Sequence, residues 1–97
     1  MTRIELAPEV LGDFDRIIDH LMRFDAQDVE ARIHELMDAI QILSHSPLIG
    51  RRVKGGQREL VIGRDARGCV ALYRYVSDID VAFVLAVRAQ RESGFKR

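Results

Sequence analysis

The chain has 97 residues, of which 47% are hydrophobic and 31% charged, with seven glycines and two prolines. This length supports one modest hydrophobic core, and the composition is typical of a globular protein, not a disordered one. Fifteen Lys and Arg balance fifteen Asp and Glu. We therefore expect a single domain over residues 1–97.

The sequence has few features that would indicate a disulfide, a metal site, a membrane span or a signal peptide. The one cysteine, Cys69, excludes an internal disulfide and the metal sites that several cysteines build. The three histidines, His20, His34 and His45, lie apart and have no metal-ligand spacing. No apolar run is long enough to span a membrane, and the start MTRIEL has no signal-peptide block. We expect a cytoplasmic protein with no cofactor, no metal and no membrane contact.

The zero net charge conceals an asymmetry between the two halves of the chain. Residues 1–50 contain four arginines against ten Asp and Glu, whereas residues 51–97 contain eleven Lys and Arg against five Asp and Glu. Such an asymmetry is typical of a protein that presents one face to anions. In the first half, acidic solvent sides of helices are a sufficient explanation.

The first half predicts a strand followed by two helices. Residues 2–6 alternate, and Pro8 is suited to the first turn of a helix, where its missing N–H costs nothing. Apolar residues then recur at helical spacing, which predicts a first buried stripe with Glu9, Asp13, Asp15 and Asp19 away from it: Val10, Leu11, Phe14, Ile17, Ile18, Leu21 and Met22.

The second helix begins where residues 24–27 interrupt the first stripe. Asp25 is the expected capping residue, and Asp28 lies near the positive end of the helix. A second stripe follows and ends near residues 44–47: Val29, Ile33, Leu36, Met37, Ile40 and Leu43. Two amphipathic helices joined by a short turn make a helical hairpin, and we expect both stripes to lie in the core.

The second half is rich in β-branched and aromatic residues at strand length. Three strands are expected at residues 58–63 (RELVIG), 69–76 (CVALYRYV) and 79–88 (IDVAFVLAVR), with a loop over 63–68 and a tight turn at 77–78. The fold class is therefore α+β: an N-terminal strand, a helical hairpin and a three-strand antiparallel meander. The helices would pack on one face of a four-stranded antiparallel sheet.

Alternation along the last two strands predicts an open sheet face. Ile79, Val81, Phe83, Leu85 and Val87 are bulky and would lie under the helices, together with Tyr73 and Tyr75. The opposite register of the middle strand is the alternative. The other face would be shallow, apolar and edged by Arg88, as expected of a docking surface or a homodimer interface. Its members would be Val70, Leu72, Arg74, Val84 and Ala86.

Arginines supply the strongest chemical signal of the chain. Strand ends and adjoining loops could bring together Arg58, Arg74, Arg88 and Arg91, and such a cluster could hold a phosphate and stabilise charge that develops on it. A nuclease also needs a group that moves a proton. Tyr73 and Tyr75 are the remaining candidates, and both are expected in the core. A solvated basic rim without function is the other interpretation.

Several motifs, taken together, resemble the RelE/ParE superfamily of bacterial type II toxin–antitoxin modules. They are SPLIGRRV with its P-x-x-G-R pattern, RELVIG, the Y-R pair of ALYRYV, and R-x-Q-R-E within FVLAVRAQRESGF. The resemblance covers essentially the whole chain and is most specific at residues 47–50 and 58–95. It implies the fold expected above, no cofactor, and a cognate antitoxin as partner. The open sheet face and the helical hairpin would dock that antitoxin.

The superfamily contains two activities. The RelE-like members cut messenger RNA on the ribosome and usually carry a C-terminal tyrosine or histidine, whereas the ParE-like members poison DNA gyrase by binding. Val70 stands where the ribosome-dependent nucleases carry a catalytic arginine, and Phe95 stands near the position of their tyrosine. The resemblance therefore favours a ParE-like toxin. Its target-binding residues would be Arg88, Arg91, Phe95, Lys96 and Arg97.

Two alternatives remain open from the sequence. One is a RelE-like, metal-independent endoribonuclease that acts on ribosome-bound messenger RNA, with its phosphate-binding candidates Arg58, Arg74, Arg88 and Arg91. The other is an interaction module without toxicity. Because one fold supports several activities, the resemblance alone does not decide among them.

Overall fold

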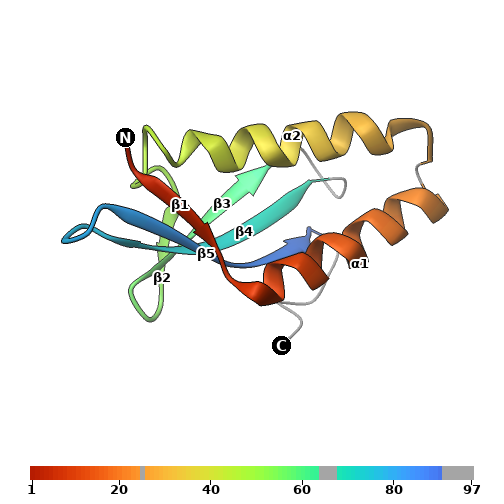
Figure 1. Ribbon diagram of the computed structural model, residues 1–97. Coiled ribbons are helices and arrows are strands. Elements are labelled where there is room, and N and C mark those ends of the chain that lie inside the picture. The colour runs from red at the N-terminus through yellow and green to blue at the C-terminus, as the bar shows by residue number, and fades with distance from the viewer. Residues whose placement is uncertain (25, 64–67, 91–97) are drawn as a thin grey trace.

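A computed structural model describes residues 1–24, 26–63 and 68–90 of the chain (Figure 1). In its first half, β1 spans Arg3–Leu6, α1 spans Pro8–Phe24 and α2 spans Val29–Ile42. A short 3-10 turn, Ala26–Asp28, precedes α2. The N-cap residue of α2 is Asp28, which makes no side-chain capping bond, and the expected cap, Asp25, lies outside the described residues.

The second half contains four strands. They are β2 (Arg51–Val53), β3 (Gln57–Ile62), β4 (Cys69–Val76) and β5 (Val81–Ala89). The three predicted strands are confirmed to within two residues at each end. β2 was not predicted, although a Gly-Gly pair between two extended segments is typical of a hairpin. Gly55 and Gly56 have φ angles of 82° and 72°, which only glycine adopts without strain, and they turn β2 back onto β3.

The strands form one sheet in the order β1-β5-β4-β3-β2. The α+β class, with an N-terminal strand and a helical hairpin, is confirmed, but the sheet has five strands instead of four and is mixed instead of antiparallel. β1 runs parallel to β5, with Arg3 opposite Val81 and Leu6 opposite Val84. Parallel neighbours need a long crossover between them, and the helical hairpin is part of that connection.

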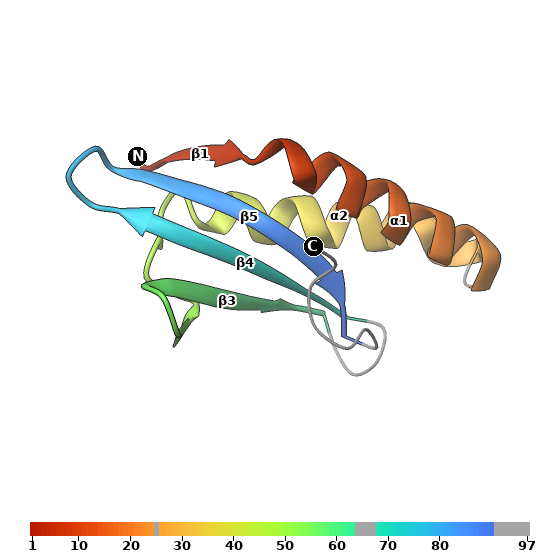
Figure 2. The ribbon, with the colours of Figure 1, turned by 90° about the horizontal axis from the view of Figure 1, so that it is seen from below.

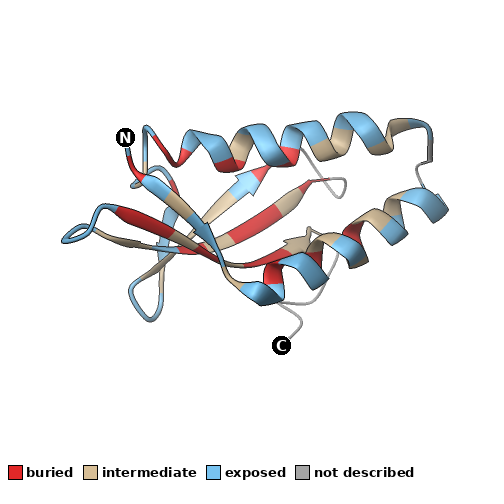
Figure 3. Cartoon of the chain, viewed as in Figure 1, coloured by how far each residue is buried: buried red, intermediate tan, exposed pale blue. Residues whose placement is uncertain are grey.

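The core lies between the sheet and the two helices, which pack on the same face (Figures 2 and 3). Its buried members come from both layers: Val10, Ile17, Leu36, Ile40, Leu43, Ile62, Ala71, Tyr73, Ala82, Val84 and Val87. The helical part of this set follows the predicted stripes, because residues three and four apart lie on one side of a helix.

Three members of the predicted stripes are exposed to solvent. Leu11, Met22 and Met37 are 61%, 62% and 42% exposed. The reason is geometric, since the apolar stripes are wider than the surface that the sheet covers. The far ends of both helices also extend past the strands (Figures 1 and 2), where Met22 lies near the end of α1.

The segment that joins α2 to β2 is held by a buried tyrosine. Tyr73 has no exposed surface, and its hydroxyl donates to the Pro47 carbonyl oxygen at 2.7 Å and accepts from the Gly50 N–H at 2.8 Å. A Cβ atom on Gly50 would lie 2.6 Å from Cε1 of Tyr73 and 2.9 Å from the Glu59 carbonyl oxygen. Only glycine therefore fits at this position, which gives the P-x-x-G motif a physical cause.

We predict that Tyr73→Phe lowers the free energy of unfolding by about 1–3 kcal/mol, because it leaves the Pro47 and Gly50 groups without this partner. Burial raises the pKa of Tyr73 above its ordinary value of 10.0, against the smaller opposing effects of the Gly50 bond and Arg58. The resulting stabilisation is complete below pH 10 and is lost as the pH rises through the folded-state pKa.

Urea unfolding between pH 7 and 11 measures both effects. In Tyr73→Phe, the free energy of unfolding should fall less between pH 7 and 11 than in the wild type, because the ionisation of Tyr73 no longer contributes. Tyr75→Phe is the matched control at pH 7, since it removes a tyrosine hydroxyl that lies at the exposed β4–β5 turn. Equal stability of wild type and Tyr73→Phe at pH 7 would contradict the proposed role of this hydroxyl.

Candidate functional site

The sheet face opposite the helices is built from one set of alternate residues on each strand. Because residues directly opposite each other share a face, the pairs of β4 and β5 place Val70 beside Arg88, Leu72 beside Ala86 and Arg74 beside Phe83 on this side. Glu59 and Val61 of β3 continue the rows through Leu72 and Val70. We call this surface the open face; the predicted orientation of β4, with Tyr73 and Tyr75 under the helices, is confirmed.

The alternation predicted for β5 is wrong over its first half. Ala82 and Val84 lie under the helices and have no exposed surface, whereas Phe83 belongs to the open face. Ala82 is opposite Tyr75 and Val84 is opposite Tyr73. The two tyrosines take up most of the space beneath the helices, so small residues of β5 fit beside them.

A β-bulge restores the predicted alternation in the second half of β5. Tyr73 pairs with Val84 and Leu72 pairs with Ala86, so that Leu85 is one extra residue in β5. An extra residue reverses the faces beyond it. Val87 is consequently in the core, while Ala86 and Arg88 lie on the open face as predicted.

The five residues predicted for the docking surface therefore differ in accessibility. Leu72 is half-buried and Arg74 is exposed, so both side chains are available at the open face. Val70 and Ala86 belong to that face by register but are only 2% and 3% exposed. Val84 is in the core, and the expectation that it lies on the open face is wrong.

The three cations of the predicted phosphate cluster that the structure describes, Arg58, Arg74 and Arg88, do not converge. Arg58 is opposite Tyr73 on the helix side of the sheet, and its guanidinium donates to the carbonyl oxygens of Leu48 at 3.1 Å and Gly50 at 2.9 Å. Arg74 lies on the open face and donates to the Gly55 carbonyl oxygen at 2.9 Å. Arg88 is opposite Val70, four residues from Arg74 along β4, a separation of roughly 13 Å.

Two further cations of the open face have carboxylate partners. Arg51 and Glu59 are 2.8 Å apart, and Arg3 and Glu5 are 3.0 Å apart. Exposed ion pairs of this kind contribute about 0–1 kcal/mol to stability. They reduce the positive charge at both edges of the sheet, which leaves Arg74 and Arg88 as the cations of its middle strands.

The two tyrosine hydroxyls, which were the remaining candidates for proton transfer, both have structural partners. Tyr73 joins Pro47 and Gly50 as described above. Tyr75 donates to Oδ1 of Asp80 at 2.8 Å, and that oxygen also accepts from the Thr2 hydroxyl at 2.7 Å. The bond to Asp80 raises the pKa of Tyr75, and the bonds from Thr2 and Tyr75 lower the pKa of Asp80. Both tyrosines therefore remain protonated donors at neutral pH.

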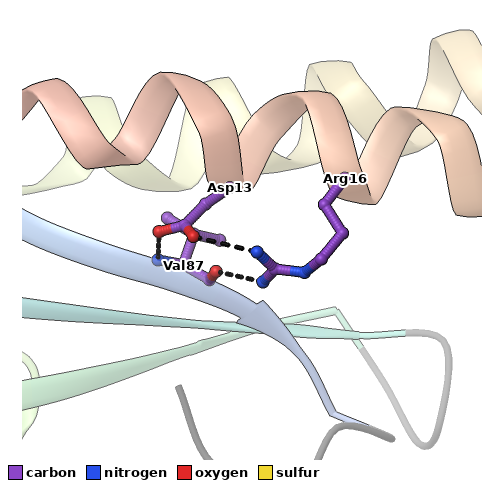
Figure 4. Close-up of polar contacts among 3 residues, drawn as sticks. All are labelled: Asp13, Arg16 and Val87. Carbon is purple, nitrogen blue, oxygen red and sulfur yellow. Dashed lines mark hydrogen bonds and ion pairs between the residues drawn. The ribbon is translucent and has the colours of Figure 1, made fainter. Parts of the chain in front are cut away.

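A buried carboxylate that the sequence interpretation missed lies where α1 meets β5 (Figure 4). Asp13 is 2% exposed; its Oδ2 accepts from the Val87 N–H at 2.9 Å and its Oδ1 accepts from Arg16 at 3.0 Å. Arg16 donates in turn to the Val87 carbonyl oxygen at 3.2 Å. The expectation that Asp13 lies away from the buried stripe is wrong. A signal was present, since Asp13 is three residues after Val10 and four before Ile17.

The C-terminal residues expected to bind the target are only partly described. Arg88 lies in β5, is half-buried, and donates to the Ala89 carbonyl oxygen at 3.2 Å. Arg91, Phe95, Lys96 and Arg97 lie outside the described residues. Among residues 1–24, 26–63 and 68–90, no group of three His, Cys, Asp or Glu could hold a metal ion. Neither helix in these ranges has the length and apolar character needed to span a membrane.

Comparisons with known proteins find one matching family and similar solved structures. The family model of the ParE toxin of the type II toxin-antitoxin system, parDE, matches residues 4–94. Among solved structures, a chain of the chromosomal ParDE TA system from P. aeruginosa is similar, with a TM-score of 0.75 and 17% sequence identity over 92% of this chain and 96% of that chain. At this identity the likeness concerns the fold. No curated protein matches.

We predict that Arg58 stabilises the fold instead of forming part of a phosphate site. Arg58→Ala should lower the free energy of unfolding by about 1–2 kcal/mol, because charged hydrogen bonds to the Leu48 and Gly50 carbonyls are lost. Urea unfolding at pH 7 measures the difference. Arg51→Ala is the matched control, since its exposed ion pair with Glu59 is worth about 0–1 kcal/mol. Equal effects of the two substitutions would contradict this assignment.

Proposed function

The chain belongs to the ParE toxin family and is a toxin of the type II toxin–antitoxin class, and from this premise we propose that it acts by binding DNA gyrase. In this proposal the toxin cleaves nothing. Arg88, with Arg91, Phe95, Lys96 and Arg97 beyond the described residues, contacts the target, and a cognate antitoxin binds the open face. The resemblance set out above links ParE-like toxins to gyrase.

One observation carries the choice of binding over cleavage. The described members of the candidate phosphate cluster are held apart: Arg58 is bound to carbonyl oxygens on the helix side, and Arg74 and Arg88 are roughly 13 Å apart along the open face. Transition-state stabilisation requires cations placed together around one developing charge. The arrangement therefore supports contacts spread over a protein surface better than a single reactive phosphate site.

The open face also has the chemistry of a peptide-binding surface. Leu72 and Phe83 are half-buried and Val61 is 59% exposed, so the face offers apolar area that is not fully covered. Arg74 and Arg88 lie on the same side of the sheet. An antitoxin segment that fits it would carry apolar residues interrupted by Asp or Glu, since interface cores are apolar and charges at their rim set orientation.

The gyrase proposal predicts inhibition of plasmid supercoiling by the purified toxin and no cleavage of messenger RNA in a reconstituted translation reaction. Arg88→Ala should weaken inhibition about tenfold, the effect of losing one interface contact of ~1.4 kcal/mol. Arg52→Ala is the matched control, because Arg52 is exposed and lies beside Arg58 away from the open face. Cleavage of messenger RNA without inhibition of supercoiling would instead support the ribosome-dependent nuclease.

The open-face proposal predicts opposite outcomes for two Asp substitutions. Leu72→Asp should leave the melting temperature close to that of the wild type and weaken antitoxin binding by tenfold or more. Val84→Asp should unfold the toxin, because it places a carboxylate in the core. Circular dichroism and calorimetric titration with purified antitoxin measure these effects.

The control for these variants is Ile79→Asp, the same kind of change at a side chain that is 59% exposed in the β4–β5 turn. It should keep both the fold and the antitoxin affinity. A folded Leu72→Asp variant with unchanged antitoxin affinity would exclude the open face as the docking surface.

A further inference from the structure

The edge of β5 that faces β1 changes its partner partway along the strand. β1 pairs with β5 only from Val81 to Val84, and the Ala7 N–H then donates to the Val84 carbonyl oxygen at 2.9 Å. The chain next enters α1 at Pro8. Farther along the same edge, at Val87, the main-chain groups are bonded to side chains of α1 instead of to a strand.

Asp13 and Arg16 reproduce at Val87 what a neighbouring strand would supply. A strand neighbour accepts from an N–H and donates to the carbonyl oxygen of the same residue. Here the Asp13 carboxylate accepts from the Val87 N–H, the Arg16 guanidinium donates to the Val87 carbonyl oxygen, and the two side chains are joined at 3.0 Å (Figure 4). The pair is one turn of α1 apart in sequence, so the helix presents both groups together.

This arrangement selects one register of β5. The N–H and carbonyl groups of successive strand residues point to opposite edges, so only every second residue can offer both groups to α1. A shift by one residue would remove both bonds and would exchange the faces of all the side chains beyond the bulge. With Val87 held, its own side chain is in the core and the next residue, Arg88, lies on the open face.

We propose that Asp13 and Arg16 are positioning residues for Arg88. They fix the register of β5 after the bulge at Leu85, and so hold the Arg88 side chain on the face where the proposed target contact is made. The part of this inference that concerns the target rests on the proposed function. The part that concerns the placement of Arg88 rests only on the bonds to Val87.

Amide hydrogen exchange of the whole toxin tests the placement. Asp13→Ala should speed exchange of the Val87 N–H about tenfold, the factor that corresponds to one hydrogen bond of ~1.4 kcal/mol, and should shift the Arg88 amide resonance. Asp13→Asn keeps an acceptor oxygen and should restore much of the protection. Asp15→Asn, at an exposed position of the same helix, should change neither signal. Unchanged Val87 exchange in Asp13→Ala would overturn the proposal.

A double-mutant cycle tests whether the pair acts through Arg88. Asp13→Ala should weaken inhibition of supercoiling about tenfold in the wild-type background and have no further effect in Arg88→Ala. Equal losses in both backgrounds would overturn the proposal, because they would show a general structural effect. If Asp13→Ala does not fold, Arg16→Ala provides the same cycle, since it removes the bond to the Val87 carbonyl oxygen while the Asp13 carboxylate can still accept from the Val87 N–H.

The two proposals fail in different ways. If the wild-type toxin does not inhibit supercoiling, the gyrase proposal is lost, and the exchange of the Val87 N–H and the resonance of Arg88 alone decide whether Asp13 and Arg16 fix the strand. If the wild type inhibits and the cycle is additive, gyrase binding stands and the positioning role is lost.

Discussion

The structure depends on hydrogen-bond partners for the main-chain groups of β5 along both edges of that strand. This strand lies between β1 and β4, and buried main-chain groups without partners are costly. β4 pairs with it over its full length, but β1 has only four residues and ends opposite Val84. Asp13 and Arg16 take over at Val87. The sheet is therefore completed by side chains of the helix that covers it, which ties the orientation of α1 to the register of the strand beneath it.

The same constraint determines which residues reach each face. Large tyrosines of β4 stand beneath the helices, so the first half of β5 contributes the small residues Ala82 and Val84 there. The bulge at Leu85 then turns Val87 inward and Arg88 outward. A straight strand could not place Val84 and Val87 on one side, because they are an odd number of residues apart. The bulge reconciles a continuous core with an arginine on the open face.

The local elements could be predicted from the sequence, but the contacts between distant elements could not. Helical periodicity and strand composition were sufficient for α1, α2, β3, β4 and β5, and the alternation of β4 gave the correct face to Tyr73. Alternation failed for Val84, because a bulge depends on the pairing of two strands and leaves no mark in either one. Asp13 was assigned to solvent, since a carboxylate in an apolar stripe has no visible partner until the helix lies against Val87. β2 was not predicted, although the Gly55-Gly56 pair is typical of the turn that joins it to β3.

The count of basic residues in the second half of the sequence overstates the charge that is available to a partner. Arg58 donates hydrogen bonds to the carbonyl oxygens of Leu48 and Gly50, and Arg51 forms an ion pair with Glu59. The motifs R-E-L and P-x-x-G thus contain residues that hold one loop to the sheet. A fold that supports both cleavage and binding can differ in activity through such placements alone. Arg58 donates to two carbonyl oxygens of one loop on the helix side of the sheet, whereas Arg74 and Arg88, which each donate to one backbone carbonyl oxygen, lie on the open face where we propose that a partner protein binds.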